Sequence, residues 1–130
     1  GQMADLYLNN VNYEGLADHL AKLTTFALKK PQLLPQLHEQ SAIEANVAII
    51  KNFPLRDDLS ALAATNITKL AVDQETCQSI MENGGISAIC EALNNMMINE
   101  NTKESIVIFK ALEKMISLAM VESSGDDDSK

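Results

Sequence analysis

The chain of 130 residues carries a formal net charge of -8 at pH 7, and 46% of its residues are hydrophobic while only 4% are aromatic. This length and apolar content suffice for one domain whose core needs neither disulfides nor a structural metal. The acidic charge excludes nucleic acid from the expected partners, because a phosphate backbone would be repelled. A membrane is excluded as well, because the chain has no apolar run of about 18 residues.

Three parts are expected along the chain. Residues 1–11 form an N-terminal segment, in which Gly1 and Gln2 are either native or the remnant of an expression tag. Residues 12–121 form a helical repeat domain, because Leu, Ile, Ala and Met supply its apolar positions and favour helices. Residues 122–130 are rich in Asp and Ser and are predicted to be a disordered acidic tail.

The first predicted helix has an apolar stripe with a period of about 3.6 residues. The stripe consists of Leu16, Leu20, Leu23 and Ala27. Pro31 ends this helix because its ring cannot continue the backbone hydrogen bonding, while Lys29 and Lys30 suit the negative end of the helix dipole. This long helix stands before the first repeat as a partial copy.

A sequence pattern occurs twice after Pro31. Residues 37–43 and residues 80–86 share a Leu or Ile, a Glu, a pair of small residues and an Ile in the same order. Each copy leads into a short apolar helix, predicted over residues 43–52 and 86–95, which ends at a polar break. Such internal similarity is typical of a repeat architecture.

A longer amphipathic helix follows each break. In the middle of the chain its apolar stripe consists of Leu59, Leu62, Ala63, Ile67, Leu70 and Ala71. In the last helix the stripe consists of Val107, Ala111, Met115, Leu118 and Ala119. Asp57 or Asp58 is expected to cap the start of the middle helix. The pattern predicts one long helix followed by two units of short, short and long helices, with no strand.

The junction between the two units has a characteristic order of residues. Leu70-Ala71 end the middle helix, a polar turn and a short helix follow, and Gly84-Gly85-Ile86 forms a corner. In this order, residues 67–89 closely resemble the junction between successive armadillo repeats. The resemblance implies an all-α, right-handed α-solenoid of armadillo-like three-helix repeats, with about two full repeats plus a partial one. It also implies a protein-binding scaffold rather than an enzyme.

The corner follows from the chemistry of glycine. Gly84 and Gly85 permit the left-handed backbone and the close approach that end one helix and start another at a sharp angle. The first copy has Ser41 and Ala42 at these positions. Its corner must therefore form without glycine.

Armadillo proteins that bind extended peptides carry an Asn on the third helix of the repeat, with a Trp one turn before it. The aligned positions here are Ala21 and Thr25, Thr65 and Lys69, and Glu113 and Ser117. None of these pairs is Trp and Asn, so the importin-like grip on basic peptides does not carry over. We predict that these six positions line the groove through which the chain binds a protein or peptide partner.

The last helix supports an alternative function, because the consecutive Ile106, Val107, Ile108 and Phe109 make it apolar on nearly every side. Such a helix needs cover on several faces, and in a stacked array only the ends remain bare. The tail, another copy of the chain or further repeats of a longer array would supply that cover. The alternative is a structural self-assembly domain, such as a homodimer, that associates around Ile106 and Phe109.

No residue pattern indicates catalysis, a cofactor or a metal site. His19 and His38 lie on different predicted helices without further ligands at metal spacing, and the sequence lacks phosphate loops and nucleophile motifs. Cys77 and Cys90 show no Cys-x-x-Cys spacing, so we predict buried, unreactive and reduced thiols. We expect a non-enzymatic protein of the cytoplasm, with the nucleus as the alternative compartment.

The methionines of the second half of the chain allow two interpretations. They are Met81, Met96, Met97, Met115 and Met120. Thioether side chains either form an adaptable binding surface or fill irregular gaps in a core. The helical spacing of these residues favours core filling.

Overall fold

The computed structural model describes residues 14–128, and the side chains within residues 14–118. These residues form helices and contain no strand, as the sequence predicts. In chain order the elements are α2 (Glu14–Ala27), the 3-10 turn η1 (Pro31–Leu33), α3 (Leu34–Glu39), α4 (Ala42–Asn52), α5 (Asp57–Leu70), α6 (Gln74–Glu82), α7 (Gly85–Ile98) and α8 (Thr102–Asp128). The predicted N-terminal segment, residues 1–11, lies outside the described range.

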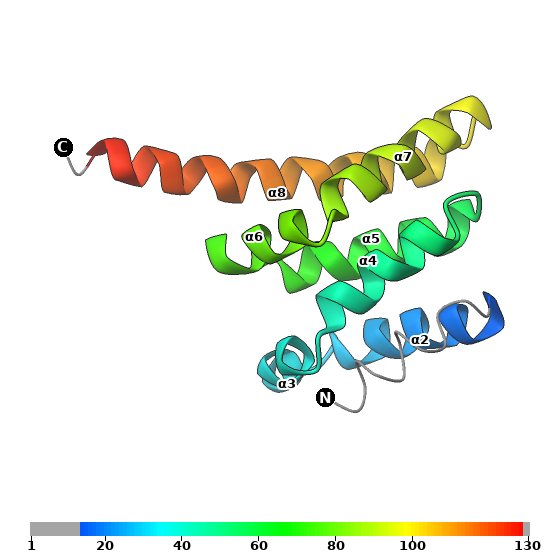
Figure 1. Ribbon diagram of the computed structural model, residues 1–130, viewed down its shortest axis with the longest axis horizontal. Coiled ribbons are helices and arrows are strands. Elements are labelled where there is room, and N and C mark those ends of the chain that lie inside the picture. The colour runs from blue at the N-terminus through cyan, green and yellow to red at the C-terminus, as the bar shows by residue number, and fades with distance from the viewer. Residues whose placement is uncertain (1–13, 129–130) are drawn as a thin grey trace.

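The helices lie in successive layers (Figure 1). α5 packs against α4 and lies between α2 and α8, while α8 also packs against α7 and α6. The short helices α3 and α6 lie at one end of the layers (Figure 1). α5 and α8 are each preceded by two shorter helices, which is the order that the sequence predicts.

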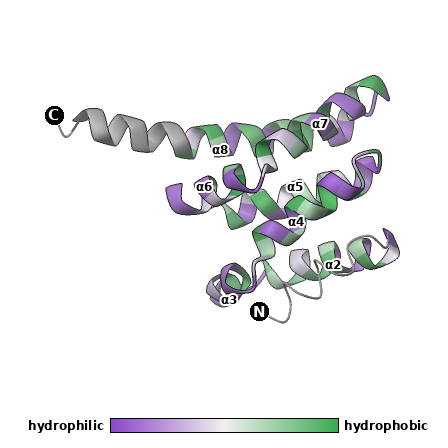
Figure 2. Ribbon diagram, viewed as in Figure 1, coloured by the Kyte–Doolittle hydropathy of each residue, from purple (hydrophilic) through white to green (hydrophobic). Residues whose placement is uncertain are grey.

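The core runs through the middle layer, where the hydrophobic segments of α4 and α5 face their neighbours (Figure 2). Fully buried side chains there include Ile49, Ile50, Leu59, Ile67 and Leu70. The predicted stripe of α5 is buried except for Leu62, which is half-buried, and Ala111 and Met115 of α8 are buried as predicted. The stripe of α2 fits less well: Leu20 is buried but Leu23 is exposed. Among the described elements, α2 packs chiefly against α5 and α4.

A buried asparagine joins three helices. The Asn66 side-chain amide on α5 donates to the backbone carbonyl of Ala21 on α2 and to Asn46 Oδ1 on α4, each at 3.0 Å. Asn66 Oδ1 lies 2.8 Å from the donating hydroxyl of Thr25 on α2. Because both amide hydrogens and the oxygen of this fully buried side chain have partners, its burial costs little and the positions of the three helices are fixed.

Asn66→Ala is expected to lower the free energy of unfolding by about 2 kcal/mol, because it removes these bonds and leaves the Asn46 carboxamide oxygen without its donor. Urea unfolding followed by circular dichroism measures the change. Asn94→Ala, at an exposed position of α7, is the control and should shift stability by less than about 0.5 kcal/mol. Equal unfolding midpoints for the two variants would contradict the structural role of Asn66.

Both predicted corners adopt the left-handed backbone. Gly84 has φ of 76°, and Ser41, at the equivalent place in the first copy, has φ of 62°. Gly85 follows at a point of close approach, since a Cβ there would lie 2.6 Å from Ile80 Cγ2 and 2.8 Å from the Ile80 carbonyl oxygen. The expectation that glycine allows both the turn and the contact is confirmed, and the first corner forms at a serine.

Gly85→Ala is expected to destabilise the protein by about 1–3 kcal/mol, because the added methyl collides with backbone as well as side-chain atoms. Gly15→Ala is the matched control, since a Cβ at that helical position meets no atom within 4 Å and alanine favours the helix. Thermal unfolding should therefore separate the two substitutions in opposite directions. A Gly85→Ala protein as stable as the wild type would show that the corner is not tightly packed.

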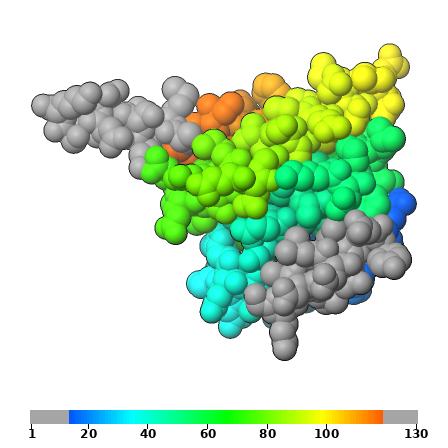
Figure 3. Space-filling model, in the orientation of Figure 1, coloured from blue at the N-terminus to red at the C-terminus, as the bar shows by residue number. Residues whose placement is uncertain are grey.

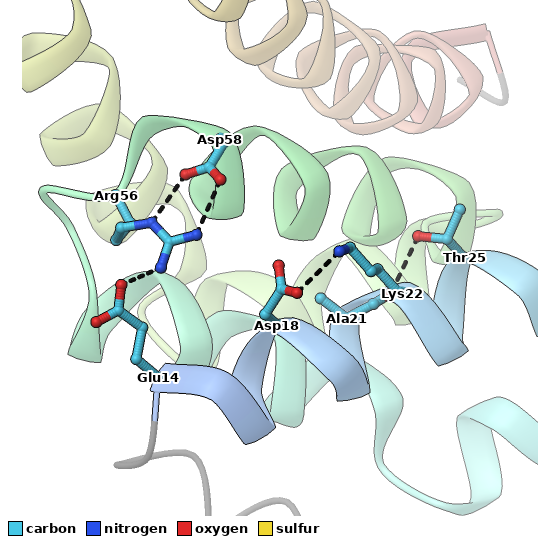
Figure 4. A network of polar contacts seen from close by, with 7 residues as sticks. All are labelled: Glu14, Asp18, Ala21, Lys22, Thr25, Arg56 and Asp58. Carbon is cyan, nitrogen blue, oxygen red and sulfur yellow. Dashed lines mark hydrogen bonds and ion pairs between the residues drawn. The ribbon is translucent and has the colours of Figure 1, made fainter.

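The predicted cap of α5 is wrong. Arg56 occupies the N-cap position, and no side chain makes a capping bond there. The Arg56 guanidinium binds both carboxylate oxygens of Asp58, at 2.8 and 2.9 Å, and also pairs with Glu14 at the start of α2 (Figure 4). This arrangement holds the pKa of Asp58 below its usual range, chiefly through the hydrogen bond from Arg56. Asp57 accepts instead from Asn101 before α8. Asp57 therefore links α5 to the turn before α8, and Arg56, held by Asp58, links the start of α5 to α2 through Glu14.

The end of the chain also differs from expectation. A disordered tail is predicted over residues 122–130, whereas α8 continues to Asp128. No proline follows Pro54 in the sequence, so no residue of the last helix removes a backbone donor from it.

Candidate interaction surface

α8 is packed on one side and open on the other. α5 has neighbours on two sides, α2 and α8, whereas no helix among the described residues covers the side of α8 that faces away from α5. Ile106 and Phe109 lie on this open side, with 50% and 58% of their surface exposed. α7 and the start of α8 form the upper edge of the molecule in Figure 3. Within the described part of the chain, neither side chain is covered by another helix.

The open side is hollowed between α7 and α8. This α7–α8 groove has a volume of about 770 Å³. Its apolar walls are formed by Leu93, Met97, Ile106 and Phe109. Charged side chains at its border are Glu100, Lys110 and Glu113. An apolar floor with a few polar groups at the rim is the usual construction of a binding groove.

The turn between α7 and α8 sets the geometry of this groove. Glu100 has φ of 58°, and the Asn101 backbone amide donates to the Met96 carbonyl at 2.8 Å, which closes the turn tightly. The Asn101 side chain then donates to Asp57 Oδ2 on α5 at 3.2 Å. The two helices are thus brought side by side and anchored on the middle layer, with the apolar residues of their outer sides adjacent.

A second, smaller groove lies further along α8. This α6–α8 groove has a volume of about 390 Å³ and is lined by Cys77, Met81, Ile86, Met115 and Ile116, with Glu82 among its polar residues. Phe109 and Ile116 are two helical turns apart, so they lie on the same side of α8. Exposed apolar side chains therefore occur on this side of α8 at both grooves, with Glu113 between them, two turns after Ile106.

The six predicted partner-binding positions do not line a common groove. Lys69, Glu113 and Ser117 are exposed, and Glu113 lines the α7–α8 groove together with Ile106 and Phe109. Lys69 and Ser117 line neither groove.

The remaining three predicted positions are engaged within the fold. Ala21 is fully buried, which corrects its assignment as a partner-binding residue: its position on α2 faces α5, and its carbonyl accepts from Asn66. The Thr25 hydroxyl bonds to Asn66, and the Thr65 hydroxyl donates to the Ala61 carbonyl at 2.8 Å.

Sequence reasoning missed the contribution of α7. Met96 and Met115 fill the core as predicted, but Met97 and Met81 are exposed and line the two grooves, so core filling is wrong for them. Met96 and Met97 occupy adjacent helical positions that point to different sides. The run of apolar residues at the end of α7 could have indicated that α7 contributes to an exposed surface. The helical spacing of these residues alone does not show which side of α7 meets α8. Met120 lies outside the residues whose side chains are described.

The two thiols have different environments. Cys77 is buried, and burial raises the pKa of its thiol. Cys90 is exposed, so the prediction of a buried thiol is wrong there. The buried side of α7 carries Ala88, Ile89, Ala92 and Met96. Cys90 falls on the other side of the helix.

In the folded protein at pH 8, iodoacetamide is expected to modify Cys90 within minutes and Cys77 only after unfolding, because Cys77 is shielded and forms less thiolate. Mass spectrometry of the digested protein measures the two rates. Cys90→Ser should remove the fast modification and serves as the control. Equal rates at both thiols would contradict the shielding of Cys77.

The chain matches no protein-family model, no curated protein and no solved structure. Within the described residues, no group of three or more His, Cys, Asp or Glu side chains is arranged to hold a metal ion. None of the described helices has the length and apolar character to cross a lipid bilayer.

Proposed function

We propose that this chain is a non-enzymatic protein-interaction module that binds an apolar segment of a partner protein on the open side of α8. In this proposal the layers are armadillo-like repeats, with α3, α4 and α5 as one unit, α6, α7 and α8 as the next, and α2 as a partial unit. The observation that supports it is the exposure of Ile106 and Phe109 beside the α7–α8 groove.

The energetics of this surface favour a binding role. Covering the exposed halves of Ile106 and Phe109 would contribute on the order of 2–3 kcal/mol, and Met97 and Leu93 add further apolar area. Large apolar side chains scattered singly over a surface need no explanation, but a contiguous group with a polar rim is typical of an interaction site. Binding on this side therefore replaces the groove along the third helices as the leading proposal.

Phe109→Asp is expected to abolish partner capture, because it places a charge at the centre of the apolar surface. Phe26→Asp on α2 is the matched control, since Phe26 is a similarly exposed phenylalanine, at 53%, on a different helix. The measurement is quantitative mass spectrometry of proteins captured by each tagged variant from the same cell extract. The predicted result is a set of proteins retained by the wild type and Phe26→Asp and lost by Phe109→Asp.

Two outcomes would contradict the proposal. Identical captured sets for the two phenylalanine variants would remove the open side of α8 as the binding site. Loss of capture in a Lys69→Ala, Ser117→Ala double variant, with Phe109→Asp unaffected, would return the site to the groove along the third helices. Circular dichroism should show unchanged helicity for every variant, because all four side chains are exposed.

A further inference from the structure

The open side of α8 can accommodate a helix that lies along it. Ile106, Phe109 and Ile116 follow one side of α8 over roughly 15 Å, which is the length of about three helical turns. α7 and α6 border this row with Met97 and Met81. The opposite side of α8 is already covered by a helix, α5. A helix laid along the open side would continue the same packing of helix on helix.

The charges around this row distinguish between occupants. Glu100 and Glu113 border the α7–α8 groove and Glu82 borders the α6–α8 groove, against a single lysine, Lys110. None of the four takes part in an ion pair with another described residue. The rim is therefore acidic and its carboxylates are available to cations from outside the chain.

A second copy of the chain is a poor occupant for the same reason. It would bring its own three rim carboxylates against the first three, and each copy carries a net charge of -8. Like charges across an interface oppose association and are a common means of rejecting wrong partners.

We propose, on the basis of the proposed function above, that the open side of α8 receives a basic amphipathic helix of another protein. The apolar ridge of this helix covers Ile106, Phe109 and Ile116, and its flanking Lys or Arg side chains meet Glu113, Glu100 and Glu82. The helix is at least about three turns long, because a shorter one would cover only one of the two grooves.

The test uses two synthetic amphipathic helices of about 16 residues with the same leucine ridge. One carries Lys at the flanking positions and the other carries Glu. Fluorescence anisotropy measures the binding of each labelled peptide to the full chain. The basic peptide is expected to bind saturably and about tenfold more tightly than the acidic one at about 50 mM salt, and the difference should shrink at about 500 mM.

Variants of the protein separate charge from apolar contact. Glu113→Lys should weaken the basic peptide roughly fivefold and strengthen the acidic one, because each exposed pair contributes modestly. Glu91→Lys is the matched control on α7, since Glu91 is exposed and lines neither groove. Phe109→Asp should abolish saturable binding of both peptides, and Phe26→Asp should leave both unchanged.

Three results would overturn the inference. If both peptides bind equally and Glu113→Lys changes neither, the partner is not basic, while sensitivity to Phe109→Asp would still support the proposed function. If neither peptide binds the wild type, the open side of α8 does not bind a basic helix. The capture experiment then tests the proposed function independently. If the wild type sediments as a dimer that Phe109→Asp converts to a monomer, a second copy occupies the surface. A monomer across the concentration range, together with preference for the basic peptide, supports the inference.

Discussion

The burial of α5 between two other long helices is the constraint from which the rest of the structure follows. Ala61, Ala63 and Ala64 leave little side chain between α5 and its neighbours, so helices can approach it closely on several sides. Asn66 then fixes the arrangement, because its three hydrogen bonds are satisfied only when α2 and α4 hold their observed positions. α8 takes the remaining side of α5. With α5 covered, α8 becomes the outermost layer of the described structure, and its apolar outer side has no partner there.

The corner at Gly84 links this stack to the interaction surface. The left-handed turn ends α6 and lets α7 begin against Ile80, where the missing Cβ of Gly85 permits contact. Lys51 Nζ on α4 donates to the Asn83 carbonyl at 2.6 Å, which ties the same corner to the middle layer. α7 is thereby held at a fixed place beside α8, and the groove between them is a consequence of packing further inside rather than of flexible side chains at the rim.

The sequence predicts what depends on neighbouring residues and misses what depends on distant ones. Helical periodicity located α4, α5 and α7, and glycine chemistry predicted the Gly84 corner, because both act within a few residues. Ala21 and Cys90 were misassigned because burial depends on which side of a helix meets which neighbour, and periodicity does not name the neighbour. Asp57 is a good N-cap by residue type, but its partner is Asn101, far along the chain. The sequence also indicates that Ile106 and Phe109 need a partner surface, because a helix that is apolar on nearly all sides has more apolar faces than its neighbours in a stacked array can bury.

An apolar surface that stays open carries a cost for a protein on its own, since it favours indiscriminate association. Glu82, Glu100 and Glu113 reduce that cost, because they set like charges against any second copy that approaches through the same side. The same carboxylates would raise the rate of encounter with a cationic partner, and this effect weakens as salt screens it. In the proposed complex, the apolar contacts and the acidic rim therefore contribute different parts of recognition. Ile106, Phe109 and Ile116 supply most of the affinity in that complex, and the carboxylates make the surface selective for basic over acidic helices.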